Sequence, residues 1–245
     1  MKKKERLDKI LVDRGLVKSR ERAKALIMEG KVIVGDSKTV KAGTLVDSSS
    51  EITLKGDESP YVSRGGVKLN AALDFFNVDP AGKVVMDIGC STGGFTDCVL
   101  KKGAKKVYAI DVGYGQFDWS LRYDPRITLL EKTNIRYLEK KSIPIPVDIV
   151  VIDVSFISLS KVLPNVLDFL KEDGEVLALV KPQFEVGKGL VDKGGIVKDE
   201  SRRLCAVENI RVFAEEVGFR VIGLRESPIR GQKGNREYFL YLRRW

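Results

Sequence analysis

Beyond residue 64, unbroken apolar runs alternate with segments in which apolar residues recur every three or four positions. Unbroken apolar runs predict buried strands, and apolar residues three and four positions apart predict helices packed on them. Strands and helices follow each other at 84–88, 95–102, 106–111, 127–131, 147–153, 159–170, 175–181 and 201–217. This order predicts an α/β fold, a doubly wound parallel sheet with helices on both faces.

The C-terminal segment breaks this alternation. Two strand-like runs, 219–224 and 238–242, are joined by 227–235, which is rich in glycine, proline and polar residues. This pattern predicts a hairpin that adds an antiparallel strand to the sheet. A parallel sheet with a terminal antiparallel hairpin is, by analogy, the architecture of class I (Rossmann-like) methyltransferases.

The N-terminal segment has a shorter pattern. Apolar residues at helical spacing within 5–15 predict one helix, and a second begins after Ser19, a good N-cap residue, and stops at Gly30. Short β-type runs at 32–34 and 52–54 predict a small sheet.

A polar stretch separates the two patterns. Residues 55–63 combine glycine, proline and charged side chains, a composition typical of a connector. We expect a small domain over 1–58, a linker over 59–63 and a large domain over 64–245.

Composition limits the classes of function. With 43% hydrophobic and 31% charged residues and no long apolar segment, the 245-residue chain predicts a globular protein without a transmembrane helix. Its basic start lacks the apolar segment of a signal peptide, so we expect the cytoplasm. The net charge is +9, and residues 1–31 hold 11 Lys/Arg against 5 Asp/Glu. That concentration favours a polyanionic partner over a surface that is basic only for solubility.

The chain has three cysteines and no histidine. Cys90, Cys98 and Cys205 form no Cys-x-x-Cys pair, so we expect reduced thiols and no metal site. Cys98 and Cys205 fall in helical runs and are expected in the core. Without histidine, any proton transfer has to use another side chain.

A glycine-rich turn follows the first strand of the large domain. From Asp87 to Thr96 the sequence reads Asp-Ile-Gly-Cys-Ser-Thr-Gly-Gly-Phe-Thr, at a predicted strand-to-helix junction. Such a turn lets the chain bend sharply and lets an adenosine lie close to the backbone. The turn residues expected around the ligand are Gly89, Cys90, Ser91, Thr92, Gly93 and Gly94.

Two acidic residues narrow the choice of ligand. Asp111 ends the second strand, where a carboxylate can accept hydrogen bonds from the ribose of NAD or of S-adenosylmethionine. Asp87 ends the first strand, where a carboxylate would repel a pyrophosphate but attract an ammonium group. We therefore expect S-adenosylmethionine as the cofactor. Asn134, after the third strand, is either an adenine contact or a surface turn residue.

Cys90 has two interpretations. A thiol at a helix N-terminus can become a nucleophilic thiolate. Here it would lie at the amino-acid end of the cofactor, away from a base, so we favour a small packing residue.

Four charged residues stand at the ends of predicted elements: Lys68, Asp153, Lys181 and Glu237. The carboxyl ends of parallel strands form one rim, where ligands bind. Asp153 and Lys181 follow two such strands, so we expect them in the same crevice as the glycine turn, where a lysine can act as a base. The alternative is a surface ion pair of Lys68 with Glu237 and two residues that merely end strands.

The N-terminal motifs resemble those of an RNA-binding family. Arg-Leu-Asp-Lys-Ile-Leu at 6–11, Ser-Arg-Glu-Arg-Ala at 19–23 and Gly-Lys-Val-Ile-Val at 30–34 closely resemble the S4 domain. In that family the basic second helix meets the RNA backbone, which fits phosphate neutralisation. The residues expected to contact RNA are Arg6, Arg20, Arg22, Lys24, Lys31 and Arg64.

The charged tetrad resembles the Lys-Asp-Lys-Glu tetrad of FtsJ-like ribose 2′-O-methyltransferases. Together with the S4-like module, the phrases at 63–69, 153–159 and 181–185 look like the TlyA family, whose members are often labelled haemolysins. The resemblance covers nearly the whole chain. It implies that a methyl group passes from S-adenosylmethionine to a ribosomal RNA ribose, at cytidine.

The resemblance also suggests roles for the tetrad. Lys181 would take or polarise the proton of the ribose hydroxyl, and Asp153 and Lys68 would orient Lys181. Glu237 would complete the hydrogen-bond network. Near-attack geometry supplies much of the acceleration in such a displacement.

Three other functions are weighed against this one. An amine methyltransferase would carry two prolines where this chain has Asp-Val-Ser-Phe at 153–156. A membrane-active haemolysin would need an apolar span or a lytic helix, and the sequence shows neither. An RNA-binding adaptor without activity would not need the tetrad.

Two further features lie near the tetrad. The glycine-rich and lysine-rich loop over 182–199 is expected either to close over RNA or to stay solvated. Phe156 and Phe184 could stack on bases, but core packing is the favoured role of each.

Overall fold

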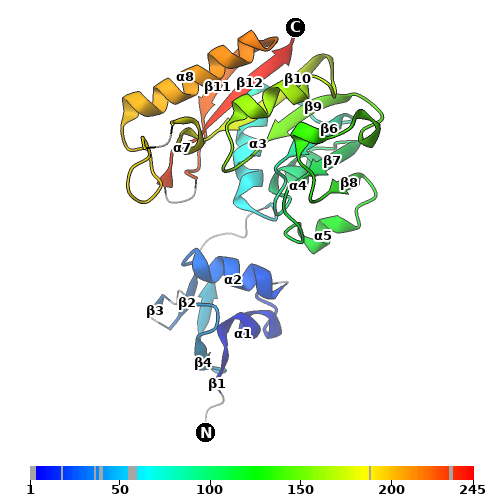
Figure 1. Ribbon diagram of the computed structural model, residues 1–245. Coiled ribbons are helices and arrows are strands. Elements are labelled where there is room, and N and C mark those ends of the chain that lie inside the picture. The colour runs from blue at the N-terminus through cyan, green and yellow to red at the C-terminus, as the bar shows by residue number, and fades with distance from the viewer. Residues whose placement is uncertain are drawn as a thin grey trace. The chain divides into compact units, whose positions relative to one another are not determined.

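The computed structural model describes residues 4–17, 19–35, 37–38, 41–54, 60–187, 189–231 and 234–245, with side chains for all of these except 37–38. The chain divides into two compact units, Met1–Glu58 and Ser59–Trp245 (Figure 1). Ser59 in the predicted linker and Lys188 in the glycine-rich loop lie outside the described residues.

The N-terminal unit contains two helices and two small antiparallel sheets in its described part. The helices are α1 (Leu7–Asp13) and α2 (Arg20–Met28), and the strands are β1 (Lys4–Arg6), β2 (Val32–Val34), β3 (Ser37–Lys38), β4 (Leu45–Asp47) and β5 (Ile52–Leu54). β1 pairs with β4, and β2 lies between β3 and β5. The two helices and the small sheet match the sequence pattern.

Local signals in the sequence define the helix ends of this unit. The Ser19 hydroxyl accepts a hydrogen bond of 3.2 Å from the Arg22 N–H, which confirms the predicted N-cap. Gly15 and Gly30 follow the helices with φ of 68° and 67°, a left-handed conformation that glycine adopts without strain. The buried faces of the helices and β2 form one core, made of Leu7, Leu11, Val17, Ala23, Leu26, Ile27 and Val32.

Asp8 is the buried charge of the N-terminal unit. Its carboxylate has no exposed surface and accepts two hydrogen bonds from Arg6, at 3.0 and 3.1 Å, and one from Arg20 at 2.9 Å. The hydrogen bonds from Arg6, together with the one from Arg20, lower the pKa of Asp8, so the carboxyl is ionised at neutral pH. Both arginine side chains remain 49% exposed. Asp8 therefore holds two guanidinium groups, from β1 and α2, side by side at the surface.

The second unit is built on one seven-stranded sheet. Its strands are β6 (Val84–Ile88), β7 (Lys106–Ile110), β8 (Ile127–Leu130), β9 (Val147–Ile152), β10 (Leu170–Val180), β11 (Phe219–Glu226) and β12 (Tyr238–Arg244). Their order is β11-β12-β10-β9-β6-β7-β8. The strands from β10 to β8 are parallel, and β12 runs antiparallel to both β10 and β11. The predicted parallel sheet with a terminal antiparallel hairpin is confirmed.

Helices cover both faces of this sheet, as Figure 1 shows. The helices are α3 (Arg64–Phe76), α4 (Gly94–Lys101), α5 (Trp119–Arg122), α6 (Leu163–Val166), α7 (Pro182–Glu185) and α8 (Glu200–Glu216), with 3₁₀ turns η1 (Ile135–Tyr137), η2 (Lys140–Ser142) and η3 (Leu159–Lys161). Leu69 of α3 and Cys98 of α4 share one core with Val85 of β6. Ile210 of α8 shares the other core with Met86, the next residue of β6. Successive strand residues thus face opposite layers.

One predicted helix is wrong. The segment 159–170 forms the 3₁₀ turn η3, the four-residue helix α6 and the first residue of β10. Pro164 stands in the first turn of α6, and because it has no N–H it cannot continue a helix from η3. β10 begins earlier than expected, at Leu170, and its pairing with β9 shifts register between Leu170 and Glu175.

Candidate active site

The glycine turn is shaped by close contacts within the protein. Gly89 has φ of 84°, and a Cβ there would lie 2.6 Å from the carbonyl oxygen of Asp153 at the end of β9. Gly93 has φ of 90°, and a Cβ there would lie 2.7 Å from Leu121 of α5. Any side chain at either position would be both strained and in collision. The turn is therefore locked between β9 and α5.

Asp111, at the end of the neighbouring strand β7, is hydrogen-bonded to the glycine turn. One carboxylate oxygen accepts a hydrogen bond of 2.8 Å from the Ser91 N–H, and the other accepts one of 2.7 Å from the Gly113 N–H. Ser91 and Thr92 are exposed, while Cys90 is buried, and burial raises the pKa of its thiol. A buried thiol of raised pKa is not a nucleophile at neutral pH, which supports the packing interpretation of Cys90.

Asp87 is a fully buried carboxyl with one unpaired oxygen. Its Oδ2 accepts a hydrogen bond of 2.6 Å from the Thr96 hydroxyl, and its Oδ1 has no partner. Burial, opposed by this hydrogen bond, raises the pKa of Asp87 to about 7. An unpaired buried acceptor beside a glycine turn suits the ammonium group of S-adenosylmethionine, so the residues present fit that cofactor.

Asn134 lies after β8, and its side chain is used locally. Its Oδ1 accepts hydrogen bonds from the backbone and the side chain of Arg136, at 3.1 and 3.3 Å, and so caps η1. This contact shows Asn134 capping the turn after β8, and its contact with adenine stays a prediction.

Lys181 and Asp153 come together at the rim as the sequence predicted. Lys181 Nζ lies 2.6 Å from Asp153 Oδ1, in an ion pair without the alignment of a hydrogen bond, and donates a hydrogen bond of 2.8 Å to the Ser155 hydroxyl. The lysine side chain is 10% exposed and the aspartate 22%. The ammonium is thus held at a partly desolvated edge with access to the crevice.

Lys68 and Glu237 form a second pair. Lys68 Nζ donates a hydrogen bond of 2.6 Å to Glu237 Oε2, and the two side chains are only 10% and 3% exposed. The backbone at Gly231 lies against the Glu237 carboxylate and leaves no room for a Cβ. The surface ion pair considered above is therefore excluded. Lys68 pairs with Glu237 and Lys181 pairs with Asp153, so the tetrad consists of two ion pairs.

Glu185 is a site residue that the sequence reading missed. It accepts hydrogen bonds from the Ser158 hydroxyl, at 2.5 Å, and from the Leu159 N–H, at 3.0 Å, and burial raises its pKa. It ties the segment after Lys181 to the segment after Asp153. Its sequence signals are its place four residues after Lys181 and its place at the end of the family-like phrase 181–185, and neither distinguishes it from a solvated glutamate.

Phe156 differs from the expectation of core packing. Its ring is 90% exposed, its φ is 64°, and its centre lies 5.0 Å from the ring of half-buried Phe184. The left-handed backbone turns the ring outward beside the Lys181 pair. Cys205, also expected in the core, is exposed on α8, whereas Cys98 is buried as expected.

The loop over 182–199 is partly ordered by the loop that carries Glu237. The Asn235 side chain accepts a hydrogen bond of 3.1 Å from the Val197 N–H and donates one of 2.8 Å to the Gly195 carbonyl. Val197 is buried despite the polar composition around it. Arg64, the predicted RNA contact in this unit, is exposed at the first position of α3.

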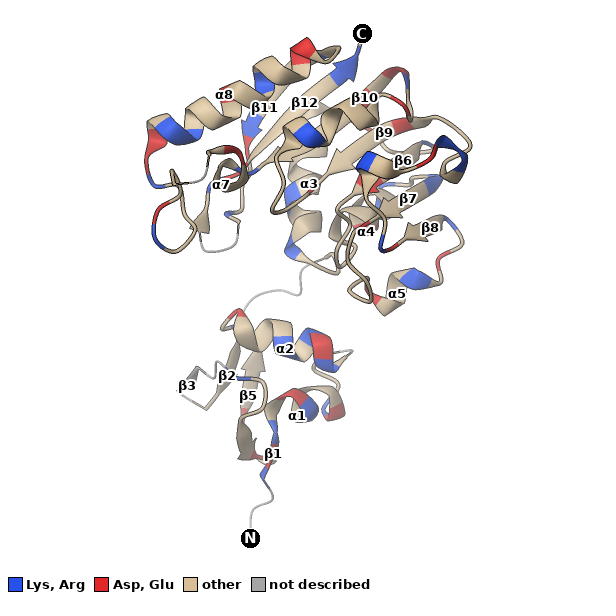
Figure 2. Cartoon of the chain, in the orientation of Figure 1, with Lys and Arg blue, Asp and Glu red and all other residues tan. Residues whose placement is uncertain are grey.

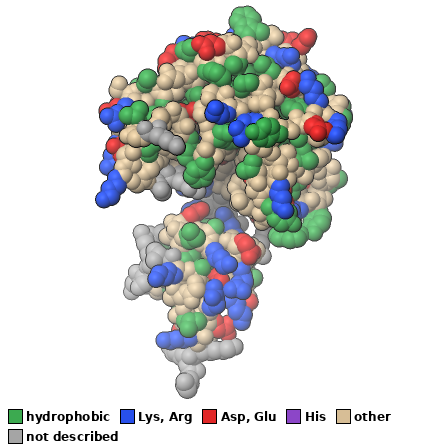
Figure 3. All heavy atoms as spheres, viewed as in Figure 1, with side chains coloured by type: hydrophobic (Ala, Val, Ile, Leu, Met, Phe, Trp, Pro, Cys, Tyr) green, Lys and Arg blue, Asp and Glu red, His purple; other side chains and the backbone are tan. Residues whose placement is uncertain are grey.

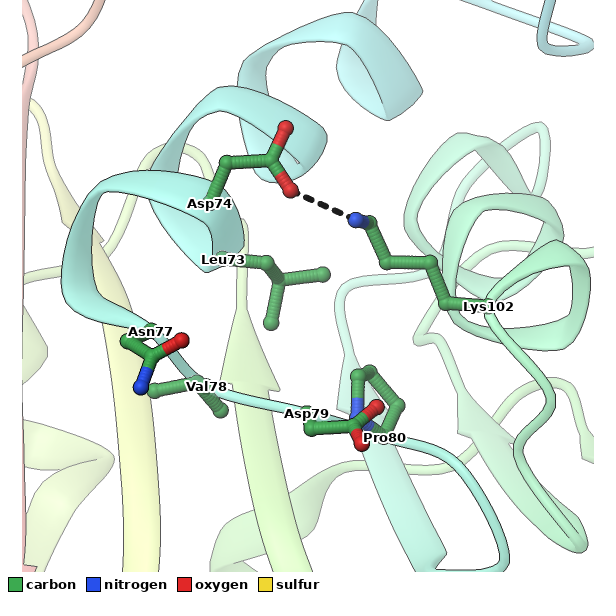
Figure 4. A pocket seen from close by; sticks show the side chains of 7 residues that line it. All are labelled: Leu73, Asp74, Asn77, Val78, Asp79, Pro80 and Lys102. Carbon is green, nitrogen blue, oxygen red and sulfur yellow. Dashed lines mark hydrogen bonds and ion pairs between the residues drawn. The ribbon is translucent and has the colours of Figure 1, made fainter.

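A hollow of about 400 Å³ lies beside the C-terminal end of α3, at the amino ends of the strands (Figure 4). It is lined by Leu73, Asp74, Asn77, Val78, Asp79, Pro80 and Lys102. Asp74 and Lys102 form an ion pair of 2.6 Å beside it. None of the predicted site residues lines it, and the rim therefore carries the candidate active site.

The described residues contain neither a metal site nor a membrane-spanning helix. No group of three or more Cys, Asp or Glu side chains is placed to hold a metal ion. No described helix is both long enough and apolar enough to cross a membrane.

Two family profiles match the chain: FtsJ-like methyltransferase over residues 61–244 and S4 domain over residues 5–52. A Mycobacterium tuberculosis protein named 16S/23S rRNA (cytidine-2′-O)-methyltransferase TlyA is 47% identical over 244 residues, 99% of this chain and 91% of that protein. The chain belongs to the TlyA family. The resemblance drawn from its motifs is confirmed.

Other relatives in the TlyA family carry a different name. Hemolysin A of Brachyspira hyodysenteriae is 40% identical over 239 residues, 96% of this chain and 98% of that protein. A solved structure from Streptococcus thermophilus, also of a protein named as a hemolysin, is 42% identical with a TM-score of 0.78. It covers 100% of this chain and 90% of that chain.

Breaking the buried pair of this TlyA-family protein is expected to destabilise its second unit. Lys68→Met leaves the Glu237 carboxylate buried without a cation, so the free energy of unfolding should fall by about 3–5 kcal/mol. Adding Glu237→Met removes both charges and should restore most of the loss. Urea unfolding followed by tryptophan fluorescence measures the change, because Trp119 and Trp245 both belong to this unit.

The control is an exposed ion pair of the same unit. Lys171 and Asp148 lie 2.6 Å apart with side chains 47% and 25% exposed. Lys171→Met should therefore lower the free energy of unfolding by less than about 1 kcal/mol. If Lys68→Met and Lys171→Met lower the free energy of unfolding equally, burial does not make the Lys68–Glu237 pair contribute more to stability.

Proposed function

We propose that the protein methylates a ribose 2′-hydroxyl of ribosomal RNA, at cytidine, with S-adenosylmethionine as the methyl donor. The observation that carries the proposal is the Lys181–Asp153 pair at the rim, in backbone contact with the glycine turn. The name of the Mycobacterium tuberculosis relative supports the same substrate. We expect the protein in the cytoplasm, where ribosomal RNA is found.

The glycine turn and its two carboxylates would hold the cofactor. Asp87 Oδ1 is the acceptor proposed for the ammonium group, and Asp111 is the acceptor proposed for the ribose hydroxyls. Gly89, Gly93 and Gly94 leave no room for a Cβ against neighbouring parts of the protein, and so determine the backbone path of the turn. When bound, S-adenosylmethionine supplies an electrophilic methyl group.

The two ion pairs would act on the acceptor ribose. In its neutral amine form, after its own proton has passed to solvent, Lys181 Nζ would take the proton that the 2′-hydroxyl loses on methylation; as an ammonium it would only polarise the hydroxyl by a hydrogen bond to its oxygen. Asp153 and Ser155 hold Nζ from two sides, at 2.6 and 2.8 Å, and so fix its direction. The buried Lys68–Glu237 pair would form the neighbouring wall and supply the second ammonium group of the tetrad.

Phe156 is proposed as a contact for the target nucleotide. Its ring is exposed beside the Lys181 pair and is backed by Phe184. An unstacked base needs an aromatic surface of this kind when RNA is recognised as a single strand. Phe156 would hold the base while the ribose faces Lys181.

The N-terminal unit is proposed to bind the RNA backbone. Figure 2 shows in blue the Lys and Arg positions along the ribbon of α2. The proposed contacts are Arg6, Arg20, Arg22, Lys24 and Lys31, with Arg64 at the start of the second unit. Contacts of this kind give affinity that falls as salt rises and that does not depend on sequence.

Replacing Lys181 is expected to remove activity while leaving the cofactor in place. Lys181→Ala should lower the methylation rate by about 10²–10⁴-fold, the range typical of a lost general base, with unchanged affinity for S-adenosylmethionine. Labelled methyl groups are followed into bacterial ribosomal subunits, and nuclease digestion identifies 2′-O-methylcytidine. The exposed control Lys171→Ala should keep full activity, and full activity of Lys181→Ala would refute its role.

Cofactor affinity is expected to depend on pH through Asp87. Its pKa is raised to about 7, so the carboxyl is protonated below that pH and cannot attract an ammonium group. The affinity for S-adenosylhomocysteine should rise by up to about tenfold per pH unit between pH 5.5 and 7. Calorimetry measures it, and Asp87→Asn should make the profile flat. A sloped profile in Asp87→Asn would assign the titration to another group.

The raised pKa of Asp87 also makes the free energy of unfolding depend on pH. A buried carboxyl favours its neutral form, so its contribution to the stability of the cofactor-free fold is lost as pH rises from about 4 through 7. Asp87→Asn should remove that part of the pH dependence of urea unfolding.

Asp8 offers a test of the RNA-binding surface. Asp8→Asn removes a negative charge, so charge alone predicts tighter RNA binding. Because Asp8 holds Arg6 and Arg20 in place, we instead expect the affinity for a ribosomal RNA fragment to fall about fivefold to tenfold. Glu21→Gln makes the same charge change on exposed α2 and should tighten binding. Fluorescence anisotropy measures both, and equal tightening would refute the positioning by Asp8.

A further inference from the structure

Helix α5 is attached to the cofactor turn by one of its faces. Phe117 and Leu121 are buried, and both lie against Gly93, where a Cβ would come within 2.9 and 2.7 Å of them. The Asp118 N–H donates a hydrogen bond of 3.2 Å to the Thr92 carbonyl, and the Asp118 side chain caps the helix at Ser120. The helix is therefore short but rigidly placed at the edge of the rim.

The other face of α5 presents two aromatic rings to solvent. Trp119 is 70% exposed and Tyr123 is 79% exposed, and their rings are stacked 6.0 Å apart at an angle of 28°. Figure 3 shows hydrophobic side chains exposed over α5. The Arg122 guanidinium lies 5.6 Å from the Trp119 ring and is held there by an ion pair of 2.7 Å with Glu131. The rings are fixed in place although they contact little of the protein.

Two further exposed tyrosines of the same unit each lie next to a cation. Lys132 lies 4.4 Å from the centre of the exposed Tyr114 ring, and Arg136 lies 5.3 Å from that of Tyr137. Among the residues that the structure describes, neither Lys132 nor Arg136 makes an ion pair. Rings next to cations that form no ion pair are complementary to bases joined by phosphates. A protein partner of neutral surface would leave these cations unmatched.

We propose that the Trp119–Tyr123 stack is a second RNA contact, on which unpaired bases next to the target nucleotide stack. The proposal rests on the proposed function, since an acceptor ribose at Lys181 brings its flanking nucleotides to this rim. The adenine of the cofactor is a poor occupant, because Phe117 and Leu121, and not Trp119, face the glycine turn. The stack tolerates any base, since every base has a π face.

Intrinsic fluorescence tests the contact directly. The chain has two tryptophans, so Trp245→Phe leaves Trp119 as the single reporter. A single-stranded ribosomal RNA fragment of about ten nucleotides should quench Trp119 emission, and S-adenosylhomocysteine should not. Quenching by S-adenosylhomocysteine alone would make the stack part of the cofactor site and overturn the proposal. No quenching by RNA would overturn it as well.

Substitutions measure what the stack contributes. Trp119→Ala and Tyr123→Ala should each weaken binding of the RNA fragment about tenfold and raise the KM for ribosomal subunits, with unchanged kcat and affinity for S-adenosylhomocysteine. Trp119→Phe should retain most of the affinity. The control is Phe75→Ala, an exposed ring on α3 that also contacts an arginine, Arg225 at 4.3 Å.

The outcomes separate this proposal from the function on which it rests. Unchanged RNA affinity in Trp119→Ala would overturn the RNA contact. A dimer that sedimentation detects in the unmodified protein but not in Trp119→Ala would also overturn it and would indicate a protein interface. Quenching by RNA together with weaker binding of Trp119→Ala would support it even if no 2′-O-methylcytidine is formed, in which case only the proposed reaction fails.

Discussion

A backbone contact between two strand ends is the constraint on which the rim depends. The Asp153 N–H donates a hydrogen bond of 2.9 Å to the Ile88 carbonyl, and Gly89 has no room for a side chain against the Asp153 carbonyl. The turn after β6 and the acid after β9 are thus parts of one backbone arrangement. The position of the Lys181 pair and the shape of the cofactor turn cannot change independently.

The sequence predicted the sheet well because its strands are buried on both faces. Such strands are continuous apolar runs, and β6 was placed from Val84 to Ile88 as the structure has it. The apolar spacing over 159–170 predicts one helix, but Pro164 confines the α-helix to four residues. The exposure of Phe156 and Cys205 could not be predicted, since residue type does not reveal which face a loop or helix leaves uncovered.

For the candidate site, positions along the chain can be predicted from the sequence, but the partners of each side chain cannot. Lys68, Asp153, Lys181 and Glu237 stand at element ends that a topology can place on one rim. Their division into two pairs depends on β12 lying between β10 and β11 in the antiparallel direction. That direction brings the start of β12 to the edge where the parallel strands end, so Glu237 reaches Lys68. No spacing rule predicts such a pairing.

The Lys68–Glu237 pair also bears on folding. It joins residues 169 positions apart, so the loop that it closes includes nearly the whole sheet. Contacts between residues so far apart in the sequence form late, after local helices have formed and neighbouring strands have paired. Intermediates that lack β12 would retain the glycine turn and its acids but lack one wall of the acceptor site. Methyl transfer would therefore report completed folding, whereas cofactor binding would not.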